Sequence, residues 1–463
     1  MRIQAGALAL TLAAIAAAPS NQPETVDLIV YNAIVVTMDS GGRVLPRGAV
    51  AIRGNRIVAV EPAEAIASAF TARETIDAGG QIVMPGLVNT HTHAPMVLYR
   101  GLADDLALME WLQKYMFPAE AKTVSPEFVR AGTRLAALEM MQSGTTTYTD
   151  MYYFEEEIAR VTRDAGLRGV LGQTVIQFPV ADAKTPQQAL ARAEAFLEEF
   201  AGDELITPAI APHAMYTLDR VTLRAVRALA DTHKAQVLIH LAETVDESKT
   251  SETQHRMSPT RYLDSIGFWG PRTLAAHAVW LSAADIQILA KRKVGVSHNP
   301  ESNMKLASGT AKVPALRRAG VTVGLGTDGA ASNNDLDMFE AMRQAAFLHK
   351  LTTGDPRAVP AGTALAMATI EGARALQMDD RIGSLEAGKR ADLIVVSMAG
   401  ARQTPMYDPI SHLVYVARGD DVTTTIVNGR ILMRDRQVLT LNEGDVIREA
   451  NGMAARVREA VAK

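Results

Sequence analysis

Between residues 85 and 385 the sequence alternates short apolar or β-branched runs with amphipathic helical stretches. The runs centre near residues 89, 148, 171, 210, 239, 276, 296 and 324. Helical patterns such as Pro186–Phe200 and Leu218–Thr232 separate several of them. Eight strands that alternate with helices over about 300 residues predict a closed parallel (β/α)8 barrel of the TIM type. A doubly wound open sheet is the alternative, but no glycine-rich nucleotide loop follows the first strand.

Two segments outside this region have a different texture. Residues 26–84 and 386–440 contain short alternating runs, such as the IVAV stretch at residues 57–60, with turn residues between them. This pattern is typical of short strands joined by turns. We therefore expect one small composite β-sandwich domain built from both chain ends, a barrel over residues 85–385 and a C-terminal helix over residues 441–463.

Residues 1–20 have the pattern of a signal peptide. Arg2 precedes an apolar, Ala-rich run from Ile3 to Ala18, and Pro19 and small polar residues follow it. A positive start, a short apolar stretch and small residues at its end indicate export, whereas the run is too short for a comfortable membrane span. We expect a periplasmic or secreted protein with no stable membrane insertion after leader removal. The alternative is a frayed Ala-rich helix on a cytoplasmic protein.

Net charge limits the kinds of molecule that this chain can bind, and the absence of cysteine limits the kinds of catalytic or metal site that it can form. The formal net charge is −4, without a long run of Lys or Arg, which argues against a nucleic-acid or anionic-membrane partner. A small, roughly neutral substrate fits better, and we expect a homo-oligomer. The absence of cysteine excludes disulfides, thiolate nucleophiles, Cys-rich zinc sites and the small zinc deaminase pattern. Any metal must therefore be held by imidazole and carboxylate.

Side chains that can bind a metal follow four of the eight runs. His91 and His93 end the first run, and His240, His277 and Asp328 end the fifth, sixth and eighth. Barrel enzymes place their chemistry at the carboxyl ends of the strands. Residues at i and i+2 of a strand point to the same side, so His91 and His93 can reach one ion. A single histidine among apolar residues is most often a core residue, but this convergence predicts a metal site.

The candidate ligands lie within longer sequence motifs. They read PGLVNTHTH, IHLAET, AAHAVWL, SHNPESNMKLASG and LGTDGAASNNDLDMFEAMR. Together they resemble the amidohydrolase superfamily, and are most similar to its deaminases of 5′-methylthioadenosine and S-adenosylhomocysteine. The resemblance covers residues 27–440. The His-x-His, His and Asp set is specific to the superfamily, whereas SHNPESN and GTDGAASNN point to the branch that also contains the triazine hydrolases.

The resemblance implies one divalent ion bound by His91, His93, His240 and Asp328. Zinc is expected, and Fe2+ or Mn2+ stays open because ligand type does not settle the metal. Three imidazoles and one carboxylate leave room for a water molecule, whose pKa the ion lowers towards ~7. Relatives with two ions use a carbamylated Lys at the end of the fourth strand. Residues 208–213 of that strand contain no Lys, which favours one ion.

The resemblance also implies roles in proton transfer. Glu243 is expected to take a proton from the attacking water and to deliver it to a ring nitrogen. His277 would orient and polarise the attacking hydroxide. Asp328 would accept the hydroxide's proton in addition to binding the metal. The alternatives are a solvated loop glutamate for Glu243 and a structural histidine for His277.

Three further residues are expected to contact the substrate. By resemblance, Glu120 binds the ribose hydroxyls and His213 contacts the purine. Trp111 lies in the same segment as Glu120 and can stack on a flat heterocycle, although ordinary lid packing is the alternative. In relatives that bind the homocysteine tail, Arg occurs on and after the third strand. Gln173 and Lys184 are what this chain offers there, which puts S-adenosylhomocysteine in doubt.

The sequence therefore predicts a metal-dependent hydrolytic deaminase of adenine nucleosides. Methylthioadenosine and adenosine are the expected substrates. The first alternative is hydrolysis of chlorinated or aminated triazines, which needs the same attack on an electron-poor carbon. Guanine-type deamination is a second alternative, and a non-catalytic scaffold is a third from another class. A scaffold is disfavoured because every expected ligand and both proton-handling residues are present.

Overall fold

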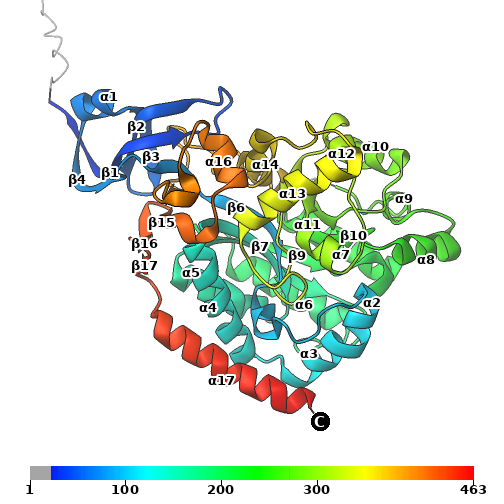
Figure 1. Cartoon of the computed structure of the whole chain (residues 1–463). Coiled ribbons are helices and arrows are strands. Elements are labelled where there is room, and N and C mark those ends of the chain that lie inside the picture. Colours follow the sequence, from blue (N-terminus) through cyan, green and yellow to red (C-terminus); the bar gives the residue numbers. More distant parts are fainter. Residues whose placement is uncertain (1–21, 271, 463) are drawn as a thin grey trace, which may run out of the picture.

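An eight-stranded parallel sheet forms the centre of the computed structural model, which describes residues 22–270 and 272–462 (Figure 1). Its strands pair in chain order from the first to the last. They are β6 (Leu87–Thr92), β7 (Thr145–Tyr152), β8 (Arg168–Val175), β9 (Ile206–Pro212), β10 (Gln236–Leu241), β11 (Thr273–His277), β12 (Gly295–His298) and β13 (Val323–Leu325). Each predicted apolar run coincides with one of them, so the predicted (β/α)8 barrel is confirmed.

Hydrogen bonds between β6 and the end of β13 close the barrel. The backbone N–H of Asp328 donates to the carbonyl of His91 at 2.9 Å. The Thr90 hydroxyl donates to the carbonyl of Leu325, also at 2.9 Å. The Asn89 amide donates to the hydroxyl of Thr327 at 2.8 Å. The first and last strands therefore meet at the residues that carry candidate metal ligands.

The barrel helices begin where side chains can satisfy free backbone N–H groups. Ser125, Thr185, Asp219, Thr244 and Ser258 each accept a hydrogen bond from an N–H in the first turn of the helix that follows. The helices are α4 (Pro126–Gln142), α5 (Glu155–Ala165), α6 (Pro186–Glu199), α7 (Arg220–His233), α8 (Val245–His255), α9 (Pro259–Ser265), α10 (Ala283–Arg292), α11 (Pro300–Lys305), α12 (Val313–Arg318), α13 (Met338–Thr353), α14 (Ala361–Met367) and α15 (Ile370–Ala375).

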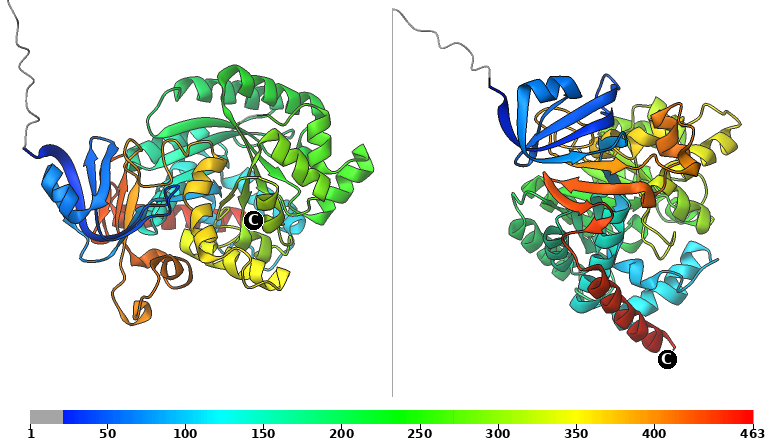
Figure 2. Two further views of the ribbon diagram at one scale, coloured as in Figure 1. Left: turned by 90° about the horizontal axis from the view of Figure 1, so that it is seen from above. Right: turned by 60° about the vertical axis from the view of Figure 1, so that its left-hand side comes forward.

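Both ends of the chain contribute to a second sheet beside the barrel (Figure 2). Hydrogen bonds join its strands into one nine-stranded mixed sheet, in the order β17-β16-β15-β14-β5-β1-β2-β3 with β4 paired to β1. The strands are β1 (Glu24–Val36), β2 (Val44–Arg53), β3 (Arg56–Pro62), β4 (Phe70–Asp77), β5 (Ile82–Pro85), β14 (Leu393–Val396), β15 (Val422–Val427), β16 (Arg430–Arg434) and β17 (Gln437–Val438). The expected composite β domain is thus present. Two short helices, α1 (Ala63–Ala69) and α16 (Pro409–Tyr415), accompany it.

Strand alternation lets this sheet pack on two sides. Leu393 and Val395 of β14 face the core of the β domain itself. Ile394 and Val396, which point the other way, belong to the same buried cluster as the barrel helices. The β domain therefore packs directly against the barrel and shares a buried apolar cluster with it.

A buried ion pair joins the barrel to the β domain. The Arg168 guanidinium on β8 contacts both carboxylate oxygens of Asp392, at 2.9 and 3.2 Å, and both side chains are buried. Arg168 also donates to the carbonyl of Glu204 at 2.7 Å. Such a bidentate pair is held firmly because each partner satisfies the other in a low-dielectric interior.

Asp392→Ala is expected to lower the free energy of unfolding by about 3–5 kcal/mol, because it leaves the Arg168 guanidinium buried without its partner. Urea unfolding followed by circular dichroism measures this change. Glu74→Ala is the matched control, since Glu74 pairs with Arg434 at 2.6 Å on the surface, where a pair contributes about 1 kcal/mol or less. Equal, small losses in both variants would contradict the assigned role of the buried pair.

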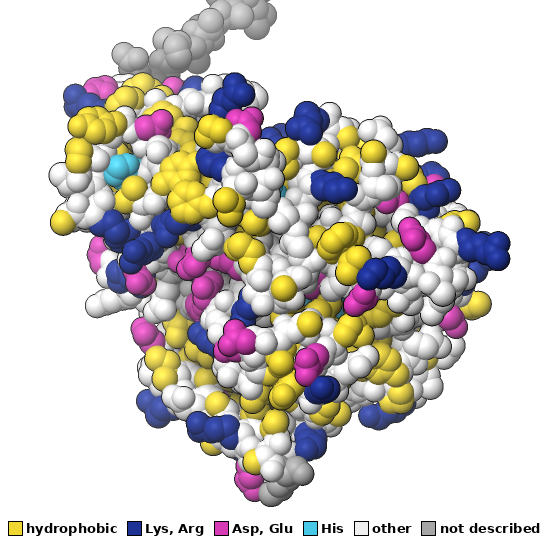
Figure 3. Space-filling view, turned by 45° about the vertical axis from the view of Figure 1, so that its right-hand side comes forward, with side chains coloured by type: hydrophobic (Ala, Val, Ile, Leu, Met, Phe, Trp, Pro, Cys, Tyr) yellow, Lys and Arg dark blue, Asp and Glu magenta, His cyan; other side chains and the backbone are white. Residues whose placement is uncertain are grey.

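The remaining segments lie around this framework. Helix α17 (Glu443–Val461) crosses the outside of α4, where Arg134 pairs with Glu449 at 2.7 Å. On the face shown in Figure 3, Lys and Arg side chains are interspersed with Asp and Glu. Among the described residues, no helix combines the length and the apolar character that crossing a membrane requires. The leader predicted over residues 1–20 lies outside the described residues and stays a prediction.

Candidate active site

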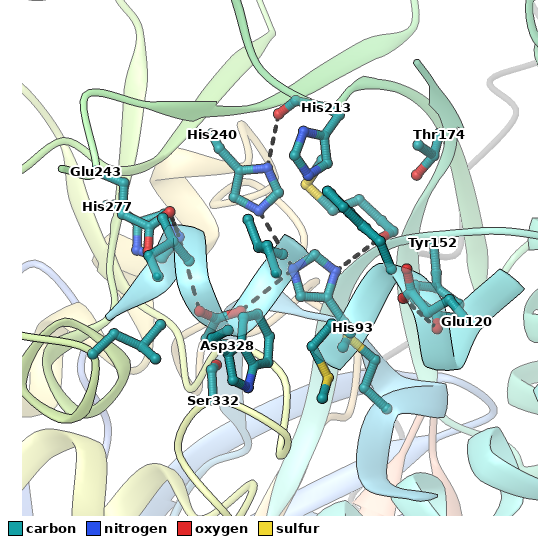
Figure 4. Close-up of a pocket in the computed structure, with 18 of the residues that line it drawn as sticks. His93, Glu120, Tyr152, Thr174, His213, His240, Glu243, His277, Asp328 and Ser332 are labelled. Carbon is teal, nitrogen blue, oxygen red and sulfur yellow. Dashed lines mark hydrogen bonds and ion pairs between the residues drawn. The ribbon is translucent and has the colours of Figure 1, made fainter. Parts of the chain in front are cut away.

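A pocket opens at the carboxyl ends of the barrel strands. The segment between β6 and α4 covers it with η1 (Ala94–Tyr99), α2 (Leu108–Glu110), η2 (Trp111–Met116) and α3 (Phe117–Thr123). Figure 4 shows the polar side chains that converge on it from the strand ends and from this cover. They are His93, Glu120, Tyr152, Thr174, His213, His240, Glu243, His277, Asp328 and Ser332.

Three imidazoles and one carboxylate meet at the base of the pocket. Nε2 of His93 lies 3.4 Å from Nε2 of His240 and 3.4 Å from Oδ1 of Asp328. Nε2 of His91 lies 3.5 Å from the same carboxylate oxygen. His91, His93 and His240 form a group whose ligand atoms all lie within 4.8 Å of one another, and His91, His277 and Asp328 form a second such group.

Hydrogen bonds behind the cluster aim the imidazoles at its centre. Nδ1 of His93 donates to the carbonyl of Met151 at 2.7 Å, and Nδ1 of His240 donates to the carbonyl of His213 at 2.7 Å. Each ring therefore turns a bare Nε2 inward. Nε2 of His91 is buried without a hydrogen-bond partner among the described residues. A buried, unpartnered imidazole nitrogen beside two others and a carboxylate fits a divalent ion.

The protonation states also suit a metal. Burial lowers the pKa of His91 to about 4 and holds the pKa of His240 well below its usual value. Burial alone would raise the pKa of Asp328, but its contact with His91 and the nearby imidazoles hold it well below the usual range. At neutral pH the cluster therefore offers imidazole lone pairs and an ionised carboxylate.

The backbone is strained where the strands deliver these side chains. Ala242, His277, Ala278 and Asp328 have φ values of 46°, 70°, 50° and 67°. Residues with a Cβ rarely adopt this left-handed region, and such strain collects at functional sites. At the ends of β10, β11 and β13 the backbone bends. These bends direct side chains into the pocket that a regular strand would direct elsewhere.

Glu243 and His277 stand together on one side of the cluster. Oε2 of Glu243 lies 3.8 Å from Nε2 of His277, which lies 3.9 Å from Oδ2 of Asp328. All three side chains are buried, and burial raises the pKa of Glu243. The backbone N–H groups of Ala242 and Glu243 donate to the carboxylate of Glu247 at 2.9 and 3.0 Å, which fixes the turn. The alternative of a solvated Glu243 does not match this buried position.

Glu120 stands on the other side of the pocket, on α3 (Figure 4). The Tyr152 hydroxyl donates to its carboxylate at 2.7 Å, and burial raises its pKa to about 7. Trp111 is buried in the pocket wall, and its Nε1 has no hydrogen-bond partner among the described residues. His213 follows β9, and burial lowers its pKa to about 3, so its ring is neutral. The pocket thus brings together Trp111, Glu120, His213, Glu243 and His277 with the candidate metal ligands at its base.

The model of the amidohydrolase family matches residues 82–432, most of the chain. The chain belongs to the amidohydrolase family.

Individual amidohydrolases similar to this chain share nearly its whole length. A 5-methylthioadenosine/S-adenosylhomocysteine deaminase of Syntrophobacter fumaroxidans is 47% identical, over 93% of this chain and 98% of its own. A 5′-deoxyadenosine deaminase of Methanococcoides burtonii is 45% identical, over 93% of this chain and 97% of its own. A crystal structure of an adenosine deaminase from Xanthomonas campestris with bound zinc superposes with a TM-score of 0.93 at 40% identity. That superposition covers 95% of this chain and all of the other.

One expectation about this amidohydrolase is wrong. Gln173 was expected near the substrate, in place of a tail-binding Arg, but its side chain faces away from the pocket. Its amide donates to Asp182 at 2.8 Å, and Thr174, the next residue of β8, is the one that lines the pocket. Lys184 lies on an outer groove that also contains Glu120.

The sequence reasoning also missed several pocket residues. Tyr152 is the last residue of β7 and Thr174 the last but one of β8, so the pattern of polar strand ends that indicates the histidines applies to them as well. Asn303 lies within the SHNPESN motif, where no role was assigned to it, and it accepts a hydrogen bond from His277. His298, which ends β12, is buried, and its Nε2 lies 3.1 Å from Nε2 of His349.

Proposed function

We propose that this amidohydrolase is a metal-dependent hydrolytic deaminase of adenine nucleosides, and that it converts the adenine ring to hypoxanthine with release of ammonia. One observation carries the proposal. Glu243 and His277 face the ligand cluster on one side of the pocket, while Glu120 and Tyr152 stand across it on the other (Figure 4). A flat base bearing a sugar matches this spacing of a reactive end and a polar end. The names of the relatives support the same activity.

We further propose a single zinc ion held by His91, His93, His240 and Asp328. Two observations support this set. Nε2 of His91 has no hydrogen-bond partner among the residues that the structure describes, and the Nε2 atoms of His93 and His240 point inward. The zinc in the related adenosine deaminase structure supports the choice of metal. When bound, the ion supplies Lewis-acid activation of water at neutral pH.

The side chains then divide the remaining work. Glu243 takes a proton from the attacking water and passes it to the ring nitrogen next to C6, which makes C6 more electrophilic. His277 accepts a hydrogen bond from the attacking oxygen and so orients it. Asp328 takes the second proton, which leaves with the amino group as ammonia. The raised pKa of Glu243 suits a group that must both accept and give a proton.

Substrate contacts follow from the walls of the pocket. His213 and Trp111 border the base, and the Glu120 carboxylate accepts hydrogen bonds from the ribose hydroxyls. Tyr152 holds that carboxylate in place from behind. Because an acceptor of two hydroxyl hydrogens works best when ionised, the raised pKa of Glu120 predicts weaker nucleoside binding as pH falls below about 7.

Glu120→Gln is expected to lower kcat/KM for nucleosides by about 10- to 100-fold, because hydrogen bonds to a charged acceptor are lost. Turnover of free bases should change little, since these lack the ribose. The fall in nucleoside affinity below about pH 7 should also disappear in the variant. Steady-state ammonia release with adenosine and adenine measures both effects. Unchanged kcat/KM for adenosine would contradict the ribose contact and weaken the nucleoside assignment.

Ammonia release across adenosine, methylthioadenosine, S-adenosylhomocysteine, guanine, cytosine and melamine tests the activity itself. We expect turnover of the first two to exceed that of the last three. Release of chloride from a chlorotriazine, without ammonia from any nucleoside, would favour the triazine alternative. Turnover of S-adenosylhomocysteine equal to that of methylthioadenosine would indicate that Lys184, at the outer groove, serves the amino-acid tail.

Export and assembly stay predictions. We propose that residues 1–20 direct the chain to the periplasm, where it would meet external nucleosides, and that it forms a homo-oligomer. The amino terminus of the mature protein and its mass in solution test these two statements.

A further inference from the structure

His277 is presented to the pocket by an unusual piece of backbone. Its φ is 70° and that of Ala278 is 50°. The N–H of Ala278 donates to the carbonyl of Leu241 at 2.9 Å, which fixes this turn to the end of β10. The ring is buried, and only its Nε2 faces the carboxylates of Glu243 and Asp328. Its other nitrogen, Nδ1, points to the start of α11.

Two asparagine amides compete for Nδ1 of His277. Oδ1 of Asn303 lies 2.9 Å from it, and Nδ2 of Asn299 lies 3.3 Å from it. One nitrogen cannot donate to the first and accept from the second at the same time. The shorter contact belongs to the Asn303 oxygen. Asn299 is turned by another bond, since its own Oδ1 accepts from the hydroxyl of Ser297 at 2.9 Å.

We propose that Asn303 is a positioning residue that keeps hydrogen on Nδ1 of His277 and so leaves a bare Nε2 facing the pocket. The inference rests on the proposed function, because Asn303 acts through His277. A ring with Nδ1–H presents a bare Nε2 to an attacking water and can take a proton there without breaking its bond to Asn303. The opposite tautomer would present an N–H and could not accept.

An amide suits this position better than a carboxylate. Asn303 accepts the hydrogen bond without adding a third negative charge beside Glu243 and Asp328. Its place is fixed, because it is buried and its N–H donates to the carbonyl of Asn299 at 3.1 Å, in the first turn of α11. If Asn303 loses its oxygen, the Asn299 amide is the one left beside Nδ1 among the described residues, at 3.3 Å, and it offers a donor. The tautomer should then reverse.

Nitrogen NMR of zinc-loaded protein labelled with 15N-histidine tests the tautomer without any substrate. The spectrum of His277→Gln identifies the signals of this ring. In the wild type we expect a protonated Nδ1 and a bare Nε2, and in Asn303→Leu we expect the reverse. A bare Nδ1 in the wild type, or a protonated Nδ1 in Asn303→Leu, would overturn the proposal.

Kinetics test the consequence for turnover. Asn303→Leu is expected to lower kcat by about 10- to 100-fold, the usual cost of losing a residue that orients a catalytic group, with little change in KM or zinc content. Asn303→Asp restores an oxygen acceptor and should recover part of kcat, since its added negative charge remains beside Glu243 and Asp328. Ser302→Ala is the matched control, because Ser302 is buried on the same helix and its hydroxyl has no hydrogen-bond partner among the described residues. Its kcat should match the wild type.

Failure of the positioning role of Asn303 and failure of the proposed deaminase function would give different results. A kcat in Asn303→Leu equal to that of the wild type would overturn the positioning role, and so would an Asp variant as slow as the Leu variant with zinc still bound. If Asn303→Leu fails to fold, the wild-type spectrum and the Asp variant still decide. Failure of the wild type to release ammonia from any nucleoside would defeat the proposed function, whereas the NMR result on His277 would stand by itself.

Discussion

Asp328→Ala is expected to abolish metal binding and turnover together. The carboxylate is the negative member of the ligand cluster, and it contacts Nε2 of both His91 and His93 within 3.5 Å. Without it, an ion would be held by imidazoles alone, and its charge would be less well compensated. The loss of activity should reach or exceed the ~10⁴-fold upper range of a lost proton-transfer group. Elemental analysis and ammonia release on the same preparation measure the two effects.

A parallel variant and a control sharpen this result. His91→Ala removes an imidazole whose Nε2 lies 3.5 Å from Asp328 and has no hydrogen-bond partner in the described part of the chain, so it should also lose metal and activity. His255→Ala removes a histidine that stacks on Tyr262 on the outside of the barrel, and it should keep both. Full zinc occupancy in Asp328→Ala would overturn the proposed ligand set. Loss of zinc from His255→Ala would show that the assay reports general damage.

Glu243→Gln should give the second-largest effect and should separate chemistry from metal binding. Glutamine keeps the shape of the side chain but cannot carry a proton between the attacking water and the ring. Turnover is therefore expected to fall by about two to four powers of ten, with zinc retained. KM should change less than kcat, because the missing step follows binding.

Glu252→Gln, an exposed position on α8, is the control for a change of charge. Its kcat should stay at the wild-type value. Near-normal turnover in Glu243→Gln would mean that another group carries the proton. His277 would then be the first candidate, since its Nε2 lies 3.8 Å from the same carboxylate.

The fold could be predicted because its signal is local and repeated. The barrel strands are runs of three to eight residues in which apolar or β-branched residues predominate, and amphipathic helices follow with capping residues such as Ser125 and Thr185. The carboxyl ends of parallel strands share one face of a barrel, so polar residues at strand ends had to converge. His91, His93, His240 and Asp328 could be grouped on that basis before any contact was known.

The rest could not be predicted because it depends on single-residue offsets and on distant partners. Successive residues of a strand face opposite sides, so assigning Gln173 instead of Thr174 to the pocket reversed the expectation. The hydrogen bond from the Tyr152 hydroxyl to Glu120 joins β7 to α3. The residue pattern within either segment does not predict it. The contact of Asn303 with His277 depends likewise on how α11 is placed after β12.

The closure of the barrel has a consequence for how the protein loses its structure. The seam between the first and last strands runs through His91 and Asp328, whose backbones are hydrogen-bonded at 2.9 Å. These residues also reach, through their side chains, toward the same candidate ion. That ion would link the first and last strands. Its binding would raise the free energy of unfolding by an amount that grows with the logarithm of the free ion concentration. Demetallation would then loosen the barrel first along this line, and metal supply in the cell would govern how long the folded protein survives as well as how fast it works.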